Sequence, residues 1–159
     1  MDSLIALGYK SETRPFLVEE LDTVMDRLAS LKVSCSNPMI ATGSLDSARR
    51  SLHSMALKKM VDIVYSSKDE FVGIVVYDIG NQWYSEDICL IEHLVLCVSP
   101  NVAGFGRVAI EIMQQRADFY DAKYLLSGNS TMNPTVPSMY TKAGFKSFPV
   151  FYKELIDNG

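Results

Sequence analysis

The sequence has few of the features that mark specialised classes of protein. Of its 159 residues, 15 are Lys or Arg and 19 are Asp or Glu, so the formal net charge is −4. A protein that binds nucleic acid generally needs a basic face, and this balance argues against that class. There is no internal repeat, low-complexity tract or linker. We therefore expect residues 1–159 to form one domain, with a core large enough to need no scaffold of disulfides or metal.

Cysteine and histidine are also scarce. The three cysteines, Cys35, Cys89 and Cys97, are odd in number and show no C-x-x-C spacing, which favours free thiols in a reducing compartment. No His/Cys cluster has the spacing of metal ligands, so we expect no structural metal. The first residues lack the apolar stretch of a signal peptide, and no later run is long enough to span a membrane. The expected location is the cytoplasm.

Apolar residues at helical spacing predict three helices. The first covers residues 15–32, with Pro15 in its first turn. The second begins near Ser44 or Asp46, either of which can cap a helix. The third covers about residues 104–121. The side chains expected to face the core from these helices are Leu17, Leu21, Val24, Met25, Leu28, Leu31, Leu45, Ala48, Leu52, Met55, Val108, Ile112 and Phe119.

Runs rich in Val, Ile, Leu and aromatic residues predict strands. A short helix over 137–143, ended by Gly144 in a left-handed conformation, separates the last two of them. The resulting order of helices and strands predicts a mixed α/β (α+β) fold with helices on the faces of one sheet. The predicted strands are 61–66, 71–78, 87–98, 123–127 and 145–155.

One turn carries a signal for ligand binding. In LVLCVSPNVAGFGRVAIEIM, a buried strand leads through a turn with Gly104 and Gly106 directly into an amphipathic helix. Glycines let backbone N–H groups approach a ligand, and the first turn of a helix leaves such groups unpaired at the positive end of its dipole. Arg107 adds a cation. These features predict a phosphate or diphosphate site, although a G-x-G before a helix is also typical of a tight turn alone.

A second segment, NPTVPSMYTKAGF, resembles the C-terminal motif of the GNAT superfamily, the acetyl-CoA-dependent N-acetyltransferases. The earlier turn, residues 101–106, resembles the cofactor motif of the same superfamily, Q/R-x-x-G-x-G/A. The two motifs occur in the family's order and at about its separation. The resemblance implies a GNAT-like mixed, mostly antiparallel sheet with helices on both faces. The residues of the second segment that fall on the pattern are Asn133, Val136, Met139, Tyr140, Gly144 and Phe145.

The resemblance also implies roles for particular residues. Acetyl-CoA is the expected cofactor, and acetyl transfer is expected to be direct, within a ternary complex. Tyr140 is expected to protonate the departing CoA thiolate as a general acid. Asn133 is expected to bind the cofactor arm, together with strand amides at Leu96 and Val98. The amides expected to hold the diphosphate are those of Ala103, Gly104, Phe105, Gly106 and Arg107.

An amine nucleophile must lose a proton, and two neighbouring residues are candidates for the base. Glu92 is preferred, acting directly or through water, because it lies on the strand that precedes the cofactor turn. His93 is the alternative, since its unperturbed pKa suits neutral pH. Side chains alternate along a strand, so only one of the two can point into a cleft.

The sequence thus predicts an N-acetyltransferase that acts on a primary amine of a small molecule or peptide, with neither nucleic acid nor membrane as a partner. The oligomeric state stays open, with a homodimer among the alternatives. Asn101 stands where the family usually has Gln or Arg, and the turn before Gly104 is about two residues shorter than the common form. These departures favour an alternative, a binding module of the same fold with weak or no catalysis. A dinucleotide-binding fold is disfavoured, because no alternating βαβ run is present.

Overall fold

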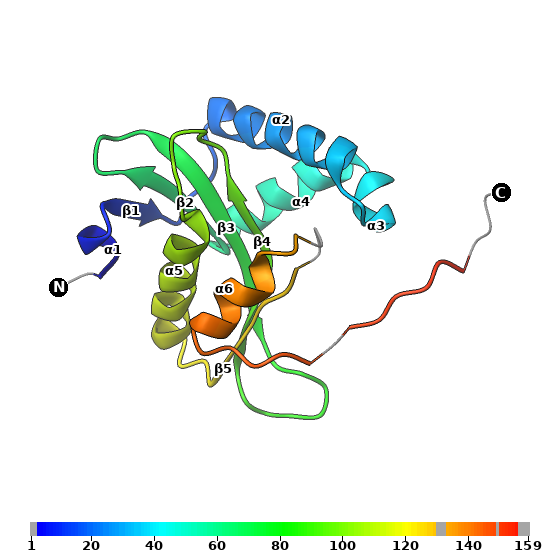
Figure 1. Ribbon diagram of the computed structural model, residues 1–159. Coiled ribbons are helices and arrows are strands. Elements are labelled where there is room, and N and C mark those ends of the chain that lie inside the picture. Colours follow the sequence, from blue (N-terminus) through cyan, green and yellow to red (C-terminus); the bar gives the residue numbers. More distant parts are fainter. Residues whose placement is uncertain (1–2, 130–132, 149, 156–159) are drawn as a thin grey trace.

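The computed structural model describes residues 3–129, 133–148 and 150–155. Its centre is one sheet with the strand order β1-β2-β3-β4-β5 (Figure 1). All neighbouring strands are antiparallel except β4 and β5, which are parallel. The mixed, mostly antiparallel sheet expected from the sequence is confirmed. Its strands are β1 Tyr9–Glu12, β2 Val61–Ser66, β3 Phe71–Gly80, β4 Cys89–Cys97 and β5 Tyr124–Leu126.

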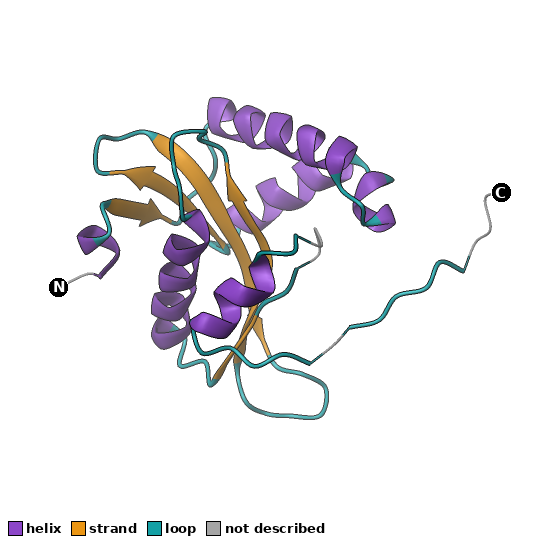
Figure 2. Cartoon of the chain, viewed as in Figure 1, coloured by secondary structure: helices purple, strands orange, loops and turns teal. Residues whose placement is uncertain are grey.

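Helices cover both faces of this sheet, as expected (Figure 2). One face is covered by α5 and α6, and the other by α2 and α4. No helix among the described residues is long and apolar enough to cross a bilayer. The helices are α1 Ser3–Ala6, α2 Val18–Ser34, α3 Pro38–Ala41, α4 Leu45–Leu57, α5 Phe105–Phe119 and α6 Val136–Lys142.

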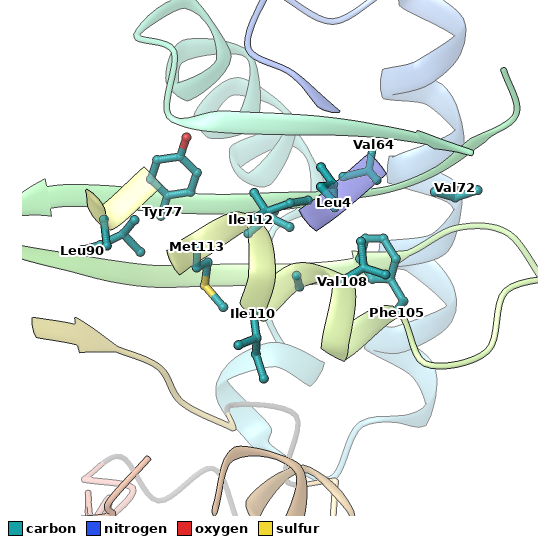
Figure 3. Close-up of a cluster of buried hydrophobic side chains, with 13 residues drawn as sticks. Leu4, Val64, Val72, Tyr77, Leu90, Phe105, Val108, Ile110, Ile112 and Met113 are labelled. Atoms are coloured by element: carbon teal, nitrogen blue, oxygen red, sulfur yellow. The ribbon is translucent and has the colours of Figure 1, made fainter. Parts of the chain in front are cut away.

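The core forms on both faces because successive side chains of a strand point to opposite sides. In β2, Val61 and Ile63 pack with α2 and α4, whereas Val64 packs with α5. Figure 3 shows the α5 side, where Ile112 and Met113 of the helix lie against the sheet. All five of these side chains are fully or almost fully buried.

A buried ion pair fixes α5 on the sheet. Asp62 of β2 is fully buried, and its carboxylate accepts hydrogen bonds from the Arg116 guanidinium and the Tyr77 hydroxyl, the latter at 2.7 Å. Burial and the adjacent Asp62 charge raise the pKa of Tyr77 above its ordinary range, so this hydroxyl keeps its proton. A buried charge is tolerated only when it is paired in this way. The pair therefore holds α5, and with it the glycine turn at its N-terminus, in place.

The first long helix starts later than predicted. Pro15 lies before α2, which begins at Val18. The buried carboxylate of Glu20 accepts a hydrogen bond from the Leu17 N–H at 2.8 Å and two more from the Arg14 guanidinium. This carboxylate, rather than the proline ring, determines where the helix begins, because it satisfies a donor that the first turn leaves unpaired. The predicted Ser44 cap of α4 is confirmed, since the Ser44 hydroxyl accepts from the Ser47 N–H.

Two side chains predicted to face the core do not. Phe119 is 72% exposed, because the last buried side chain of α5 is that of Ala117. The Phe119 ring packs edge-to-face on Tyr120 instead. Leu17, which precedes α2, is 49% exposed. The elements α1 and β1 were not predicted. The β1 sequence, YKSE, contains only one large apolar residue, so it lacks the apolar run by which a strand is recognised. As an edge strand, β1 stays partly exposed and needs no such run.

The predicted last strand, 145–155, is wrong for the described part of that range. No strand is formed by residues 145–148 or 150–155. A strand is stable only when a neighbour receives its backbone hydrogen bonds, and these residues pair with none of the described strands.

A glycine in β3 is required for the packing of the turn that leads into α5. A β-carbon on Gly73 would meet the carbonyl oxygen of Leu96 and the ring of Phe105, the first residue of α5. We therefore expect Gly73→Ala to lower the free energy of unfolding by about 1–3 kcal/mol, as overpacking does. Urea unfolding of the purified variant measures this effect. Gly80→Ala is the matched control, since it lies in the same strand with open space around it. Equal effects of the two variants would contradict the packing role.

Candidate active site

A cavity opens where two strands of the sheet separate. The strands β4 and β5 pair only through Cys89, Leu90 and Ile91 of β4. Beyond Ile91, the edge of β4 that faces away from β3 has no strand beside it among the described residues. The cavity beside this open edge has a volume of about 260 Å³, smaller than most sites that enclose a whole small-molecule ligand. Its lining residues are Glu92, His93, Leu94, Val95, Gly106, Gly128, Asn129, Val136, Met139 and Tyr140.

A β-bulge in β4 shapes the cavity wall. In the register between β3 and β4, Tyr77 pairs with Glu92 and Val76 pairs with Leu94, so His93 is an extra residue without a partner. A bulge of this kind bends the strand and redirects its side chains. Glu92 contacts Tyr140 of α6, whereas His93 Nε2 lies 2.9 Å from Asp78 Oδ2 of β3. The two neighbours therefore reach toward different elements, and Glu92 is the one that meets Tyr140.

Glu92 and Tyr140 form a hydrogen-bonded pair inside the cavity. The Tyr140 hydroxyl donates to Glu92 Oε1 at 2.8 Å, and Glu92 Oε2 accepts the Gly128 N–H at 3.0 Å. Burial raises the pKa of Glu92, although the Gly128 N–H, the Tyr140 hydroxyl and His93 all act to lower it. Burial raises the pKa of Tyr140 as well, and the Glu92 charge and hydrogen bond raise it further. The pair thus combines a base that is easier to protonate than an ordinary Glu with a phenol that keeps its proton at neutral pH.

The C-terminal motif positions Tyr140 in this pair. Gly144, at φ +92, turns the chain at the end of α6, which confirms the predicted left-handed stop. The chain then folds back, so that the Phe145 N–H donates to the Tyr140 carbonyl at 3.0 Å and the two rings pack edge-to-face at 4.9 Å. Gly144 and Phe145 therefore hold Tyr140 in position through one backbone hydrogen bond and one ring contact. This is a physical reason for the spacing between Tyr140 and the Gly-Phe pair in the motif.

The glycine turn leaves several backbone donors unpaired. Gly104 has φ +75, a left-handed conformation that favours glycine, and α5 starts at the next residue. No described residue accepts a hydrogen bond from the N–H of Ala103, Phe105 or Gly106. The Arg107 N–H, in contrast, donates to the Gly104 carbonyl at 3.1 Å, so this amide is already engaged. The Arg107 side chain is exposed and makes no ion pair with another described residue.

The middle of α6 lies close to this turn. A β-carbon on Gly106 would collide with the thioether of Met139, which means that the methionine side chain packs against the glycine. Gly106 nevertheless lines the cavity together with Glu92 and Tyr140. The entrance of α5 and the Glu92–Tyr140 pair therefore face one continuous space. Phe105 contributes only its backbone here, because its ring is buried beneath Gly73.

Two of the predicted strand amides point the wrong way. The Val98 N–H donates to the Val72 carbonyl of β3 at 2.9 Å, so the prediction that it faces the cofactor is wrong. Peptide groups alternate along a strand, and Leu96 therefore shares the direction of Val98. The carbonyl of Cys97 accepts from Arg27 Nε of α2 at 3.3 Å, which places the peptide groups of Cys97, and by alternation those of Val95, on the open edge.

Asn133, predicted to bind the cofactor arm, is not among the residues that line the cavity. Its side-chain oxygen accepts from the backbone N–H and the hydroxyl of Thr135, at 3.0 and 2.8 Å, in the turn before α6. Asn129 lines the cavity instead, and its amide nitrogen donates to the Asn133 carbonyl at 2.7 Å. Sequence reasoning missed Asn129. The only signal for it was its position in the Ser-Gly-Asn turn that directly follows β5.

Comparison with solved structures identifies the fold. The chain resembles an aminoglycoside 6'-N-acetyltransferase from Acinetobacter baumannii, with 11% identity, a TM-score of 0.63, and coverage of 94% of this chain and 100% of that one. It resembles the glucosamine-6-phosphate N-acetyltransferase of Arabidopsis thaliana, with 11% identity, a TM-score of 0.61, and coverage of 94% and 99%. An acetyltransferase of Trypanosoma brucei matches with 14% identity, a TM-score of 0.59, and coverage of 92% and 100%.

No protein-family model matches the sequence, and no curated protein matches it. The chain therefore has the fold of these acetyltransferases over nearly its whole length, and the GNAT-like fold expected from the two motifs is confirmed. At such low identity the likeness concerns the fold, whereas function has to be argued from the site.

Proposed function

We propose that the protein is an N-acetyltransferase that transfers acetyl from acetyl-CoA to a primary amine. The observation that carries the proposal is the 2.8 Å hydrogen bond between Tyr140 and Glu92 in a cavity that also reaches the glycine turn at Gly106. Acyl transfer to an amine needs one group that takes a proton from the amine and one that gives a proton to the leaving thiolate. The cavity holds one residue suited to each task.

The residues around the cavity fit coenzyme A. The N–H groups of Ala103, Phe105 and Gly106 at the start of α5 have no acceptor among the described residues, and they are donors for the diphosphate. The exposed Arg107 side chain lies beside them. The peptide groups of Val95 and the N–H of Cys97, on the open edge of β4, would pair with the pantetheine arm. Bound acetyl-CoA supplies the acetyl group as an activated thioester.

The Glu92–Tyr140 hydrogen bond gives the proton a complete route. Glu92 accepts a proton as the amine nitrogen forms its bond to the acetyl carbon, and Tyr140 donates its proton to the sulfur as the carbon–sulfur bond breaks. Protonation of Glu92 removes the negative charge that raises the pKa of Tyr140, so the phenol becomes a stronger acid when it is needed. The proton on Glu92 then returns along the 2.8 Å hydrogen bond to Tyr140. The net change moves one proton from the amine to CoA.

The primary test combines binding and turnover. We expect calorimetry to show binding of acetyl-CoA, and incubation with acetyl-CoA and a panel of amines to release free CoA thiol and form the acetylamide. The panel includes aminoglycosides and amino sugars, because two of the similar solved structures are an aminoglycoside N-acetyltransferase and a glucosamine-6-phosphate N-acetyltransferase. Binding of acetyl-CoA without transfer to any amine would contradict the catalytic part of the proposal. Absence of binding at millimolar acetyl-CoA would contradict all of it.

Two observations favour a second candidate, a binding module of the same fold. Asn101 replaces the usual Gln or Arg of the turn, and Met139 packs on Gly106, where the diphosphate would approach. The binding experiment separates this candidate from the first, because a module without the cofactor would neither bind acetyl-CoA nor release CoA.

The glycine turn carries its own prediction. We expect Gly106→Val to raise the dissociation constant of acetyl-CoA at least about tenfold, equivalent to about 1.4 kcal/mol, because a side chain there displaces Met139 and obstructs the N–H groups at the helix entrance. Calorimetry measures the constant, and circular dichroism checks that α5 is retained. Gly80→Val introduces the same side chain into open space and should leave binding unchanged. Unaltered binding by Gly106→Val would place the diphosphate elsewhere.

A further inference from the structure

A second cavity adjoins the candidate active site on the face of the sheet that α4 covers. It has a volume of about 430 Å³, which is within the range of small-molecule sites. One of its lining residues, His93, also lines the cavity of Glu92 and Tyr140, so the two cavities meet at the bulge of β4. We call it the α4 cavity, and its polar lining residues are Arg50, Ser51, Ser54, Lys58, Asp78 and His93.

The wall of the α4 cavity that α4 forms is cationic. Arg50 and Lys58 lie four residues on either side of Ser54, the spacing that puts side chains on one face of a helix. Both cations are exposed, and neither makes an ion pair with a described residue, although Asp46 lies one turn before Arg50. Their charges are therefore available to an anionic group of a ligand.

The two cations are selected from two neighbouring pairs. Residues 49–59 contain Arg49 beside Arg50 and Lys58 beside Lys59, and only one member of each pair lines the α4 cavity. Arg49 instead donates to Asp22 Oδ1 of α2 at 2.9 Å. The cationic wall is thus a local feature of one helix face, and the chain supplies a matched control for each of its two charges.

The hydroxyls on the same wall are also available. In α2 the hydroxyls of Thr23, Ser30 and Ser34 donate to the carbonyl four residues earlier, at 2.8, 3.3 and 3.2 Å. The hydroxyls of Ser51 and Ser54 in α4 make no hydrogen bond with a described residue. They can therefore donate to the same anionic group as the two cations.

The opposite wall of the α4 cavity is anionic. Asp78 of β3 lines it, with Oδ2 at 2.9 Å from His93 Nε2. Glu92, the candidate base, is the residue before His93 in β4. Carboxylates attract a protonated amine. The α4 cavity therefore carries positive charge on its helix side and negative charge on its strand side, next to the base.

We propose that the α4 cavity binds the acetyl acceptor, a small primary amine that also carries a phosphate or a carboxylate. The anionic group lies between Arg50 and Lys58, and the amine lies beside Asp78, from where it reaches Glu92. The role of the amine rests on the proposed function, whereas the anion site depends only on the residues of the helix wall. Polycations such as aminoglycosides are disfavoured as acceptors, although the protein as a whole has a net charge of −4.

Calorimetry on the full chain tests the anion site without any need for turnover. The probes are two pairs, glucosamine-6-phosphate with glucosamine and 4-aminobutyrate with butylamine, and the two members of each pair differ in the anionic group. At least one anionic probe is expected to bind at least about tenfold more tightly than its uncharged counterpart, because its contacts to the cations are charge-assisted. Equal binding within both pairs, or no binding of either anionic probe, would overturn the proposal.

Two double variants separate a local site from a general effect of charge. Arg50→Gln with Lys58→Gln is expected to reduce the preference for the anionic probe to within about twofold. Arg49→Gln with Lys59→Gln removes the same two positive charges outside the cavity and is expected to retain the preference. An equal loss in both double variants would show that long-range charge produces the preference, and it would overturn the site.

The same pairs of probes then serve as acceptors in the assay of CoA release. The anionic amine is expected to have a KM at least about tenfold below that of its counterpart, and the Arg50/Lys58 double variant is expected to remove this difference. Acetylation of both members with equal KM would overturn the acceptor site while the proposed function stands. Binding of the anionic probe through Arg50 and Lys58 without acetylation of any amine would overturn the proposed function and the acceptor role, and it would leave only the anion site.

Discussion

Replacement of Tyr140 with Phe is expected to lower kcat by about 10²- to 10⁴-fold, the usual contribution of one general acid or base, while the dissociation constant of acetyl-CoA stays within about twofold. The variant keeps the ring that packs on Phe145 and removes only the hydroxyl. The loss therefore appears in the chemical step, because the thiolate would have to leave without a proton. Stopped-flow or steady-state assays of CoA release, together with calorimetry, separate the two effects.

Tyr140→Phe should also alter the pH dependence of the activity. The Tyr140 hydroxyl lowers the pKa of Glu92 through its hydrogen bond, so its removal raises the pKa of that carboxyl further. The residual activity of the variant should then decline at a higher pH than that of the wild type as the solution is acidified. Tyr84→Phe, which changes an exposed tyrosine outside the cavity, is the control and should change neither rate nor profile. An unchanged rate for Tyr140→Phe over the whole pH range would contradict the assignment of Tyr140 as the general acid.

Replacement of Glu92 with Gln is expected to produce a loss of similar size, about 10²- to 10⁴-fold in kcat. Burial raises the pKa of Glu92, so the wild type should lose activity on acidification at a pH above about 4.3, the ordinary value for Glu, as the base becomes protonated. In the Gln variant this acidic decline should disappear, because no carboxylate is left to titrate. The raised pKa of Tyr140 predicts that phenol ionisation causes no alkaline decline below about pH 10.

Two further variants test the assignment of the base. Glu86→Gln changes an exposed carboxylate outside the cavity and should leave both rate and pH profile as they are. His93→Asn removes the alternative base while Glu92 and Tyr140 remain, and it is expected to retain most of the activity. If His93→Asn abolished transfer and Glu92→Gln did not, the histidine at the bulge would be the base.

The geometry of the candidate site could be predicted from the sequence where it depends on local features. The turn at Gly104 needs a left-handed residue before a helix, and the pair Gly144-Phe145 clamps Tyr140 from its own chain segment. Both can be recognised because the residues involved are neighbours in sequence. The direction of the strand amides could not be recognised in this way. Val98 was predicted to present its N–H to the cofactor, but this N–H donates to the Val72 carbonyl instead. Its direction is decided by the register in which β4 pairs with β3.

The sequence by itself determined most of the helices and strands and the layer structure, because hydrophobic periodicity directly reflects which face of each segment is buried. Tertiary structure alone decided the bulge at His93 and the approach of Tyr140 to Glu92 across 48 residues. It also decided that residues 145–148 and 150–155 form no strand, although their composition is that of one. Periodicity measures burial along one segment, whereas register and pairing depend on a partner that lies far away in the chain.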